Sequence, residues 1–193
     1  MIIDPRLLRL RDLVEQRSVL RGEFTLASGI KSEYYFDGRR VTHDPEGITL
    51  IGELIEEVLQ NSKIEAVGGP ATGANPMITA VQMVSRLRRR PIGGFFVRNE
   101  KKEYGTAQQI EGNFPSKGAN VAILDDTITT GGSIQKAIDV VESAGVRVAK
   151  LVVVVDRRQG GVESLRARGY EVEALLTAEG EKVFIAPGAS LDV

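Results

Sequence analysis

Two adjacent carboxylates, Asp125 and Asp126, stand where the sequence predicts the end of a strand. The four residues before them, 121–124, are all apolar, and so short a run is typical of a buried strand. A turn rich in threonine and glycine follows over residues 127–133, and apolar residues then recur at helical spacing from Ile134 to Ala144. The pattern therefore predicts a strand, an acidic pair, a turn and a helix, in that order.

These residue types suit a ligand with two chemically different ends. Glycines let backbone N–H groups approach an anion closely, and the amino end of a helix adds partial positive charge. The hydroxyl groups of Thr129, Thr130 and Ser133 are donors for phosphate oxygens. Two carboxylates repel phosphate, but they suit sugar hydroxyls or a divalent cation shared with the ligand. A ribose 5-phosphate satisfies both ends.

Residues 121–133, VAILDDTITTGGS, closely resemble the signature with which type I phosphoribosyltransferases bind phosphoribosyl diphosphate (PRPP). The resemblance implies that Asp125 and Asp126 belong to the catalytic residues and hold the ribose hydroxyls, and that the turn surrounds the 5-phosphate. The PRPP-binding residues that it implies in this segment are Asp125, Asp126, Thr127, Ile128, Thr129, Thr130, Gly131, Gly132 and Ser133. The alternative is an ordinary strand-to-helix turn with a capping threonine.

A second glycine-rich turn, within residues 66–76, follows another short apolar run. It has no ionisable side chain, so any anion contact must come from backbone N–H groups, with Thr72 as a hydroxyl donor. In type I phosphoribosyltransferases the turn at this place holds the pyrophosphate, which implies that Thr72 and Gly73 bind PRPP. The other interpretation is a strand-to-helix turn whose glycines serve tight packing. The two interpretations are compatible with each other.

Residues 22–40 contain two strand-like pieces around Ser28 and Gly29, which predicts a hairpin. By pattern alone this is an edge hairpin without chemistry. The segment closely resembles the amino-terminal part of orotate phosphoribosyltransferases. The resemblance implies that Tyr34, Tyr35 and Phe36 line the pocket for the orotate base.

The polar stretch from Arg98 onward lacks periodicity, so by itself it predicts a charged surface loop. It resembles the catalytic loop of orotate phosphoribosyltransferases. That resemblance implies that Arg98 and Lys102 are catalytic and neutralise the departing pyrophosphate. Asn99 and Tyr104 stand where the family usually has Lys and His, and are expected PRPP contacts. In the family this loop, residues 98–109 here, reaches the neighbouring subunit's site, which implies a homodimer.

Arg157 follows a β-branched run that is typical of a central parallel strand, residues 147–156. Open α/β sheets bind ligands at the carboxyl ends of their strands, and a guanidinium fork fits a carboxylate. The family places an arginine here that binds the orotate carboxylate, and Thr129 is expected to contact orotate as well. An exposed arginine at a strand end is the alternative interpretation.

Composition narrows the class of protein. The 193 residues carry a net charge of −1 and include no cysteine and no tryptophan. We therefore expect neither a nucleic-acid-binding surface nor, since no apolar run approaches the ~20 residues of a membrane span, a membrane segment. The absence of cysteine fits a reducing compartment, and we expect a cytoplasmic protein.

Two further features have competing interpretations. His43 is the only histidine; it is either a general base or a residue at the entry to the helix that Asp44 and Pro45 predict. The basic run within residues 86–90 is either a solvated helix end or an RNA-binding patch.

The sequence thus predicts a single α/β domain over residues 1–193. We expect a parallel sheet of about five strands over residues 64–177, flanked by helices, with residues 1–40 forming a small hood. The resemblance implies transfer of the 5-phosphoribosyl group from Mg-PRPP to orotate, giving orotidine 5-phosphate and pyrophosphate. Mg²⁺ would be bound mainly through PRPP, with Asp125 as a candidate ligand. The alternatives are transfer to uracil or a purine, and a non-catalytic PRPP-binding regulator, which Asn99 and Tyr104 keep open.

Overall fold

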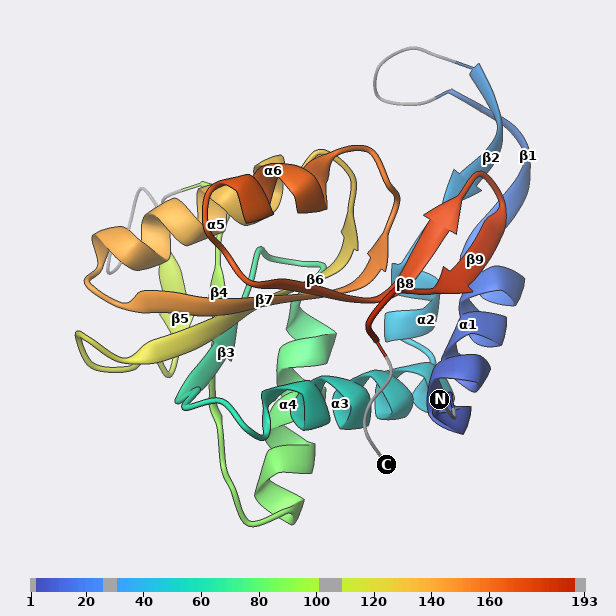
Figure 1. Ribbon diagram of the computed structural model, residues 1–193. Coiled ribbons are helices and arrows are strands. Elements are labelled where there is room, and N and C mark those ends of the chain that lie inside the picture. Colours follow the sequence, from blue (N-terminus) through green and yellow to red (C-terminus); the bar gives the residue numbers. More distant parts are fainter. Residues whose placement is uncertain (1–2, 26–30, 101–108, 190–193) are drawn as a thin grey trace.

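The computed structural model describes residues 3–25, 31–100 and 109–189, and its centre is a seven-stranded sheet (Figure 1). The strand order is β5-β4-β3-β6-β7-β8-β9. The strands are β3 (Ala66–Gly68), β4 (Gly93–Val97), β5 (Ile110–Gly112), β6 (Asn120–Ile128), β7 (Arg147–Asp156), β8 (Val172–Glu179) and β9 (Lys182–Ile185).

The five inner strands, from β4 to β8, are parallel, which confirms the predicted number of parallel strands. The two edge strands, β5 and β9, are antiparallel to their neighbours. The sheet extends beyond the predicted five strands at both edges, where β5 and β9 each follow the strand they pair with and return along it. Strands β3 and β6 are parallel neighbours, so their carboxyl ends lie side by side, and these two ends position the site.

Helices cover both faces of the sheet, as predicted. In Figure 1, α5 (Gly132–Ser143) and α6 (Gly161–Ala167) lie on one face, and α3 (Pro45–Leu59) and α4 (Asn75–Leu87) on the other. The predicted start of α3 is confirmed: Asp44 Oδ1 accepts hydrogen bonds from the N–H groups of Glu46 and Gly47, at 3.1 and 2.9 Å.

The core explains why the acidic pair has a fixed position. Residues 121–124 of β6 and 151–155 of β7 are almost fully buried, and they are apolar throughout. Burial of this kind stabilises the fold by roughly 25 cal/mol per Å² of apolar surface. Asp125 continues the same strand, so its backbone is as firmly held as that of the core.

The amino-terminal elements pack at the β9 side of the sheet. Helix α1 (Pro5–Arg17) begins after Asp4, whose carboxylate accepts from Arg6 N–H at 2.7 Å, and it packs on α3 and β9. Strands β1 (Val19–Thr25) and β2 (Lys31–Phe36) form the predicted antiparallel hairpin, and the short α2 (Arg39–Thr42) follows. The chain therefore passes from the hairpin directly to the carboxyl end of the sheet.

The basic run at the end of α4 has a structural role. Glu56 of α3 is 1% exposed and pairs with Arg88 at 2.5 Å and Arg90 at 2.8 Å. Arg90 also donates to the carbonyl groups of Leu59 and Gln60. The side chains of Arg88 and Arg90 stay 39% and 35% exposed, as the solvated-end interpretation expects, and in addition they tie α4 to α3.

We expect Glu56→Gln to lower the free energy of unfolding by about 2 kcal/mol, because the two charge-assisted hydrogen bonds of a buried carboxylate are lost. Urea unfolding followed by circular dichroism measures this change. Glu53→Gln is the matched control on the same helix: Glu53 is 37% exposed and lies 3.8 Å from Arg6, so its loss should be below about 0.5 kcal/mol. Equal losses in the two variants would contradict the role of Glu56.

Candidate active site

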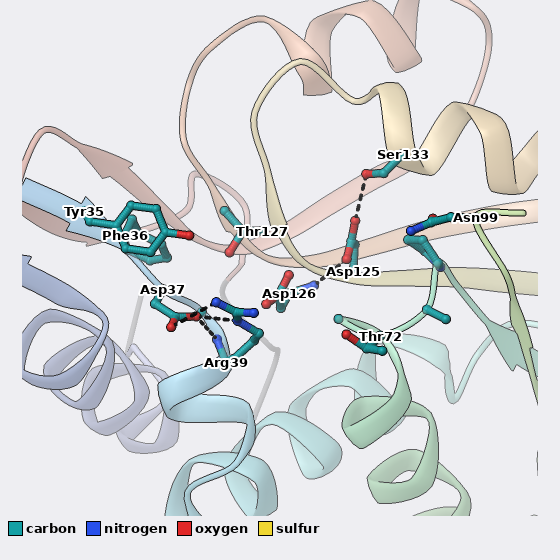
Figure 2. Close-up of a pocket in the computed structure, with 14 residues that line it drawn as sticks. Tyr35, Phe36, Asp37, Arg39, Thr72, Asn99, Asp125, Asp126, Thr127 and Ser133 are labelled. Carbon is teal, nitrogen blue, oxygen red and sulfur yellow. Dashed lines mark hydrogen bonds and ion pairs between the residues drawn. The ribbon is translucent and has the colours of Figure 1, made fainter. Parts of the chain in front are cut away.

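A cavity of about 380 Å³ lies at the carboxyl ends of β3 and β6, closed on one side by the turn after β2 (Figure 2). The lining residues are Tyr35, Phe36, Asp37, Gly38, Arg39, Pro70, Ala71, Thr72, Gly73, Asn99, Asp125, Asp126, Thr127 and Ser133. We call this cavity the central pocket. Four segments distant in sequence, residues 35–39, 70–73, 99 and 125–133, therefore meet at the place where parallel sheets bind ligands.

The central pocket gathers many of the residues expected from the sequence. Those expected to bind PRPP that line it are Thr72, Gly73, Asn99, Asp125, Asp126, Thr127 and Ser133. Tyr35 and Phe36, which were expected to line the pocket for the orotate base, line the central pocket as well. Lys102 and Tyr104 lie outside the described residues.

Asp125 is buried at the base of the pocket, 6% exposed. Its Oδ1 accepts a hydrogen bond from the Asp126 N–H at 3.1 Å, and its Oδ2 accepts from the Ser133 hydroxyl at 3.3 Å. Burial, followed by repulsion from the Asp126 carboxylate, raises the pKa of Asp125 well above its usual range. Ser133, in the first turn of α5, therefore helps to hold the Asp125 carboxyl group in place.

Asp126 points into the pocket and is half-buried (Figure 2). Burial raises its pKa, the nearby Asp37 carboxylate raises it further, and the Arg39 guanidinium and the Thr127 N–H oppose that shift. A ligand that carries hydroxyl groups or a cation would lower the pKa of Asp126 again, because it favours the ionised carboxylate.

The turn between β6 and α5 has the geometry of an anion site. Gly131 has φ +82°, a left-handed conformation that favours glycine, and α5 starts at the next residue. Thr129 and Thr130 are exposed, whereas Ile128 is buried in the core, so only the backbone of Ile128 can face a ligand. The first turn of a helix leaves backbone N–H groups without intrahelical partners, and such groups are suited to bind an anion.

The turn after β3 lies directly beside the acids. A Cβ atom on Gly73 would come within 3.1 Å of an oxygen of both Asp125 and Asp126. The Ala71 N–H donates to the Val97 carbonyl at 2.8 Å, which fixes the turn to β4. Thr72 is exposed at the pocket mouth. Phosphate oxygens bound here would sit next to a sugar held by the two acids.

Arg157 stands beside the central pocket, against the hairpin. Its guanidinium carbon lies 4.8 Å from the Phe36 ring centre and 5.6 Å from that of Tyr34, and Nη2 donates to the Tyr34 hydroxyl at 3.3 Å. Its buried Nε has no hydrogen-bond partner in the described part of the chain. A cation held between aromatic rings with an unused donor suits a flat anionic ligand.

Arg98 faces a neighbouring cavity of about 400 Å³, which shares Pro70, Asn99 and Ser133 with the central pocket. Arg98 pairs with Glu111 of β5 at 3.2 Å. Lys136 of α5 lines the same cavity, and nothing in the sequence pattern had singled it out.

His43 does not line the central pocket; its Nδ1 lies 3.0 Å from the Arg39 carbonyl.

The residues present fit Mg²⁺ bound through a ligand. Three carboxylates line the central pocket, and their oxygens are the hard donors that Mg²⁺ prefers. Within the described ranges, however, no group of three acidic, histidine or cysteine side chains could hold a metal by itself. A magnesium ion here would take most of its ligands from substrate phosphate and water.

Comparison with known proteins identifies the family. Residues 38–173 match the family described as "Phosphoribosyl transferase domain". The orotate phosphoribosyltransferase of Rhodopseudomonas palustris (strain TIE-1) is 40% identical over 175 residues, covering 88% of this chain and 92% of that protein. This chain belongs to the orotate phosphoribosyltransferase family. The resemblance found in the sequence is confirmed.

Solved structures of orotate phosphoribosyltransferases share the fold. The Mycobacterium tuberculosis H37Rv enzyme in complex with Fe(III) dicitrate superposes with a TM-score of 0.82 at 35% identity, over 92% of this chain and 99% of that one. The same enzyme in complex with PRPP gives a TM-score of 0.76 at 35% identity, over 90% and 96%. None of the helices built from the described residues is long and apolar enough to cross a membrane.

The raised pKa of Asp125 predicts a gain of stability on neutralising it. The native state keeps a proton that the unfolded chain releases near its ordinary pKa of 3.8, so the free energy of unfolding falls as pH rises from there toward the raised value. We expect Asp125→Asn to raise the free energy of unfolding near pH 8 by about 1 kcal/mol or more, and to flatten its pH dependence.

Urea unfolding near pH 6 and near pH 8 measures both effects, with Asp139→Asn on the exposed side of α5 as control. A variant that is less stable than the parent protein near pH 8 would contradict the assignment.

Proposed function

We propose that this chain transfers the 5-phosphoribosyl group from Mg-PRPP to orotate and releases pyrophosphate. The observation that carries the proposal is the buried acidic pair between two glycine-rich turns, with Arg157 held over the aromatic hairpin beside it. This arrangement offers a place for a sugar diol, for phosphate at either end of it, and for a flat anionic base. The family relationship points to the same reaction.

Each part of PRPP has its own partner in the proposed complex. Asp125 and Asp126 accept hydrogen bonds from the ribose hydroxyls, and the backbone N–H groups of residues 129–133 hold the 5-phosphate. The turn that contains Thr72 and Gly73 holds the diphosphate through its backbone. When bound, Mg²⁺ supplies positive charge to the diphosphate. The protein therefore fixes both ends of the sugar and leaves the anomeric carbon open to the base.

Arg157 selects the base. Its unused donors bind the orotate carboxylate, while Phe36 and Tyr34 hold the guanidinium in place. Uracil has no carboxylate and would leave Arg157 without an anion. Orotate is proposed to lose its N1 proton to solvent before N1 attacks the anomeric carbon, so the protein need not supply a strong base.

We further propose that the chain acts as a homodimer in which residues 98–109 serve the neighbouring site. Arg98 lies at the edge of the central pocket but points into the adjoining cavity, where it pairs with Glu111. Arg98 and Lys102 are proposed to neutralise the departing pyrophosphate. Asn99 carries no charge, so a chain that binds PRPP without consuming it, acting as a regulator, is the second candidate.

A base panel tests the reaction. Pyrophosphate release from Mg-PRPP is followed with orotate, uracil, adenine or hypoxanthine added separately, and the expected result is release with orotate alone. Release with another base would refute orotate as substrate. PRPP binding without release in any of the mixtures would favour the regulator.

We expect Arg157→Gln to raise the KM for orotate roughly tenfold to a hundredfold while leaving the KM for PRPP within about twofold, because one charge-assisted contact to the base is lost. Arg158→Gln is the matched control: Arg158 is the next residue and pairs with Glu179 at 2.7 Å, outside the pocket lining. Steady-state kinetics with each substrate varied in turn makes the comparison. A uniform loss for both substrates would contradict a role in base recognition.

A further inference from the structure

The turn between β2 and α2, Asp37 and Gly38, lines the central pocket together with Arg39, the first residue of α2. These residues lie in the segment 22–40 singled out from the sequence, but no individual role was expected of them. This turn lies across from the turn that contains Thr72, with Asp126 between them (Figure 2). Its side chains therefore face the space that the proposed function gives to the sugar and its diphosphate.

Arg39 is held in a fixed orientation by Asp37. Its Nε lies 2.8 Å from Asp37 Oδ1 and its Nη2 3.3 Å from Asp37 Oδ2, and the Arg39 backbone N–H also donates to Oδ1, at 3.2 Å. The Arg39 guanidinium lowers the pKa of Asp37, so both groups stay charged. Among the described residues, Nη1 of Arg39 has no partner, which leaves one edge of the guanidinium free.

Gly38 shows how closely this turn is pressed onto the acids. A Cβ atom at Gly38 would lie 2.7 Å from Thr127 Oγ1 and 2.8 Å from Asp126 Oδ2. Its φ of −60° is open to any residue, so the requirement for glycine here is close approach alone. Glycine at position 38 therefore lets the turn lie directly against Asp126 and Thr127, and Arg39 follows it in the pocket lining.

The charge of the pocket gives Arg39 a role. Asp37, Asp125 and Asp126 line the pocket, and Arg39 is the one cationic side chain among its described lining residues. Three carboxylates repel a diphosphate, and the backbone N–H groups of the opposite turn carry only partial charge. A guanidinium with a free edge matches phosphate oxygens in charge and in shape.

We propose that Arg39 binds the diphosphate of PRPP, and the pyrophosphate product, from the side of the pocket opposite to Thr72, and that Asp37 is a positioning residue for it. This inference rests on the proposed function for the identity of the ligand. It assigns to the segment after the hairpin a contact with the leaving group, in addition to the aromatic residues that face the base.

Equilibrium binding with three probes in the presence of Mg²⁺ tests the proposal: PRPP, inorganic pyrophosphate and ribose 5-phosphate, which lacks the diphosphate. We expect Arg39→Gln to weaken binding of PRPP and pyrophosphate by about tenfold or more, and binding of ribose 5-phosphate by less than about twofold. Arg39→Lys should restore part of the loss, and Asp37→Asn should lose less than Arg39→Gln.

Arg9→Gln is the matched control. Arg9 makes a similar two-bond pair with Glu46, at 2.6 and 2.8 Å, and its side chain is 47% exposed against 57% for Arg39, but it lies on α1 away from the pocket lining. The affinity of Arg9→Gln for each of the three probes should equal that of the parent chain.

Unchanged pyrophosphate affinity in Arg39→Gln, or an equal loss for all three probes, would overturn the proposal. The outcome is separate from that of the base panel. If the parent chain turns over orotate but Arg39→Gln binds pyrophosphate as tightly as the parent chain does, only this inference is refuted. Arg39-dependent pyrophosphate binding without turnover of orotate would refute the proposed reaction alone.

Discussion

The structure depends on one unfavourable arrangement: two adjacent carboxylates are buried at the end of a core strand. Asp125 and Asp126 repel one another and lose hydration, and the pKa of each is raised. The apolar residues of β6 and β7 fix the strand, so the backbone positions of the two acids are held next to one another. A ligand that offers hydroxyls and a cation is the partner that relieves this arrangement.

The surrounding turns are built to approach the pair closely. Glycines at positions 38 and 73 allow two different turns to come within contact distance of Asp126. Gly161, at the start of α6, packs on the Thr129 carbonyl, where a Cβ atom would lie at 2.5 Å, so α6 supports the turn between β6 and α5. Closely packed turns thus surround the acidic pair, while pocket-lining side chains such as Thr72 and Arg39 remain exposed.

Local patterns predicted much of this arrangement. The sequence predicted the strand, acidic pair, turn and helix around Asp125, because each of these features depends on neighbouring residues. The capped start of α3 was predictable for the same reason. The edge strand β5 was missed because three residues in a polar stretch carry no periodicity. Glu56 was missed because its role depends on Arg88 and Arg90, which only the tertiary fold brings near. Arg39 pairs locally with Asp37, but only the tertiary fold places this pair in the pocket that holds Asp126.

The central claim is that ligand binding drives the buried acidic pair into its ionised form. Titration calorimetry of Mg-PRPP near pH 7, in two buffers with different ionisation enthalpies, counts the protons released on binding. The account predicts that the parent chain releases more protons than Asp125→Asn, since the ligand's own protons are common to both. Equal proton release by the two proteins, with binding detected in each, would contradict it.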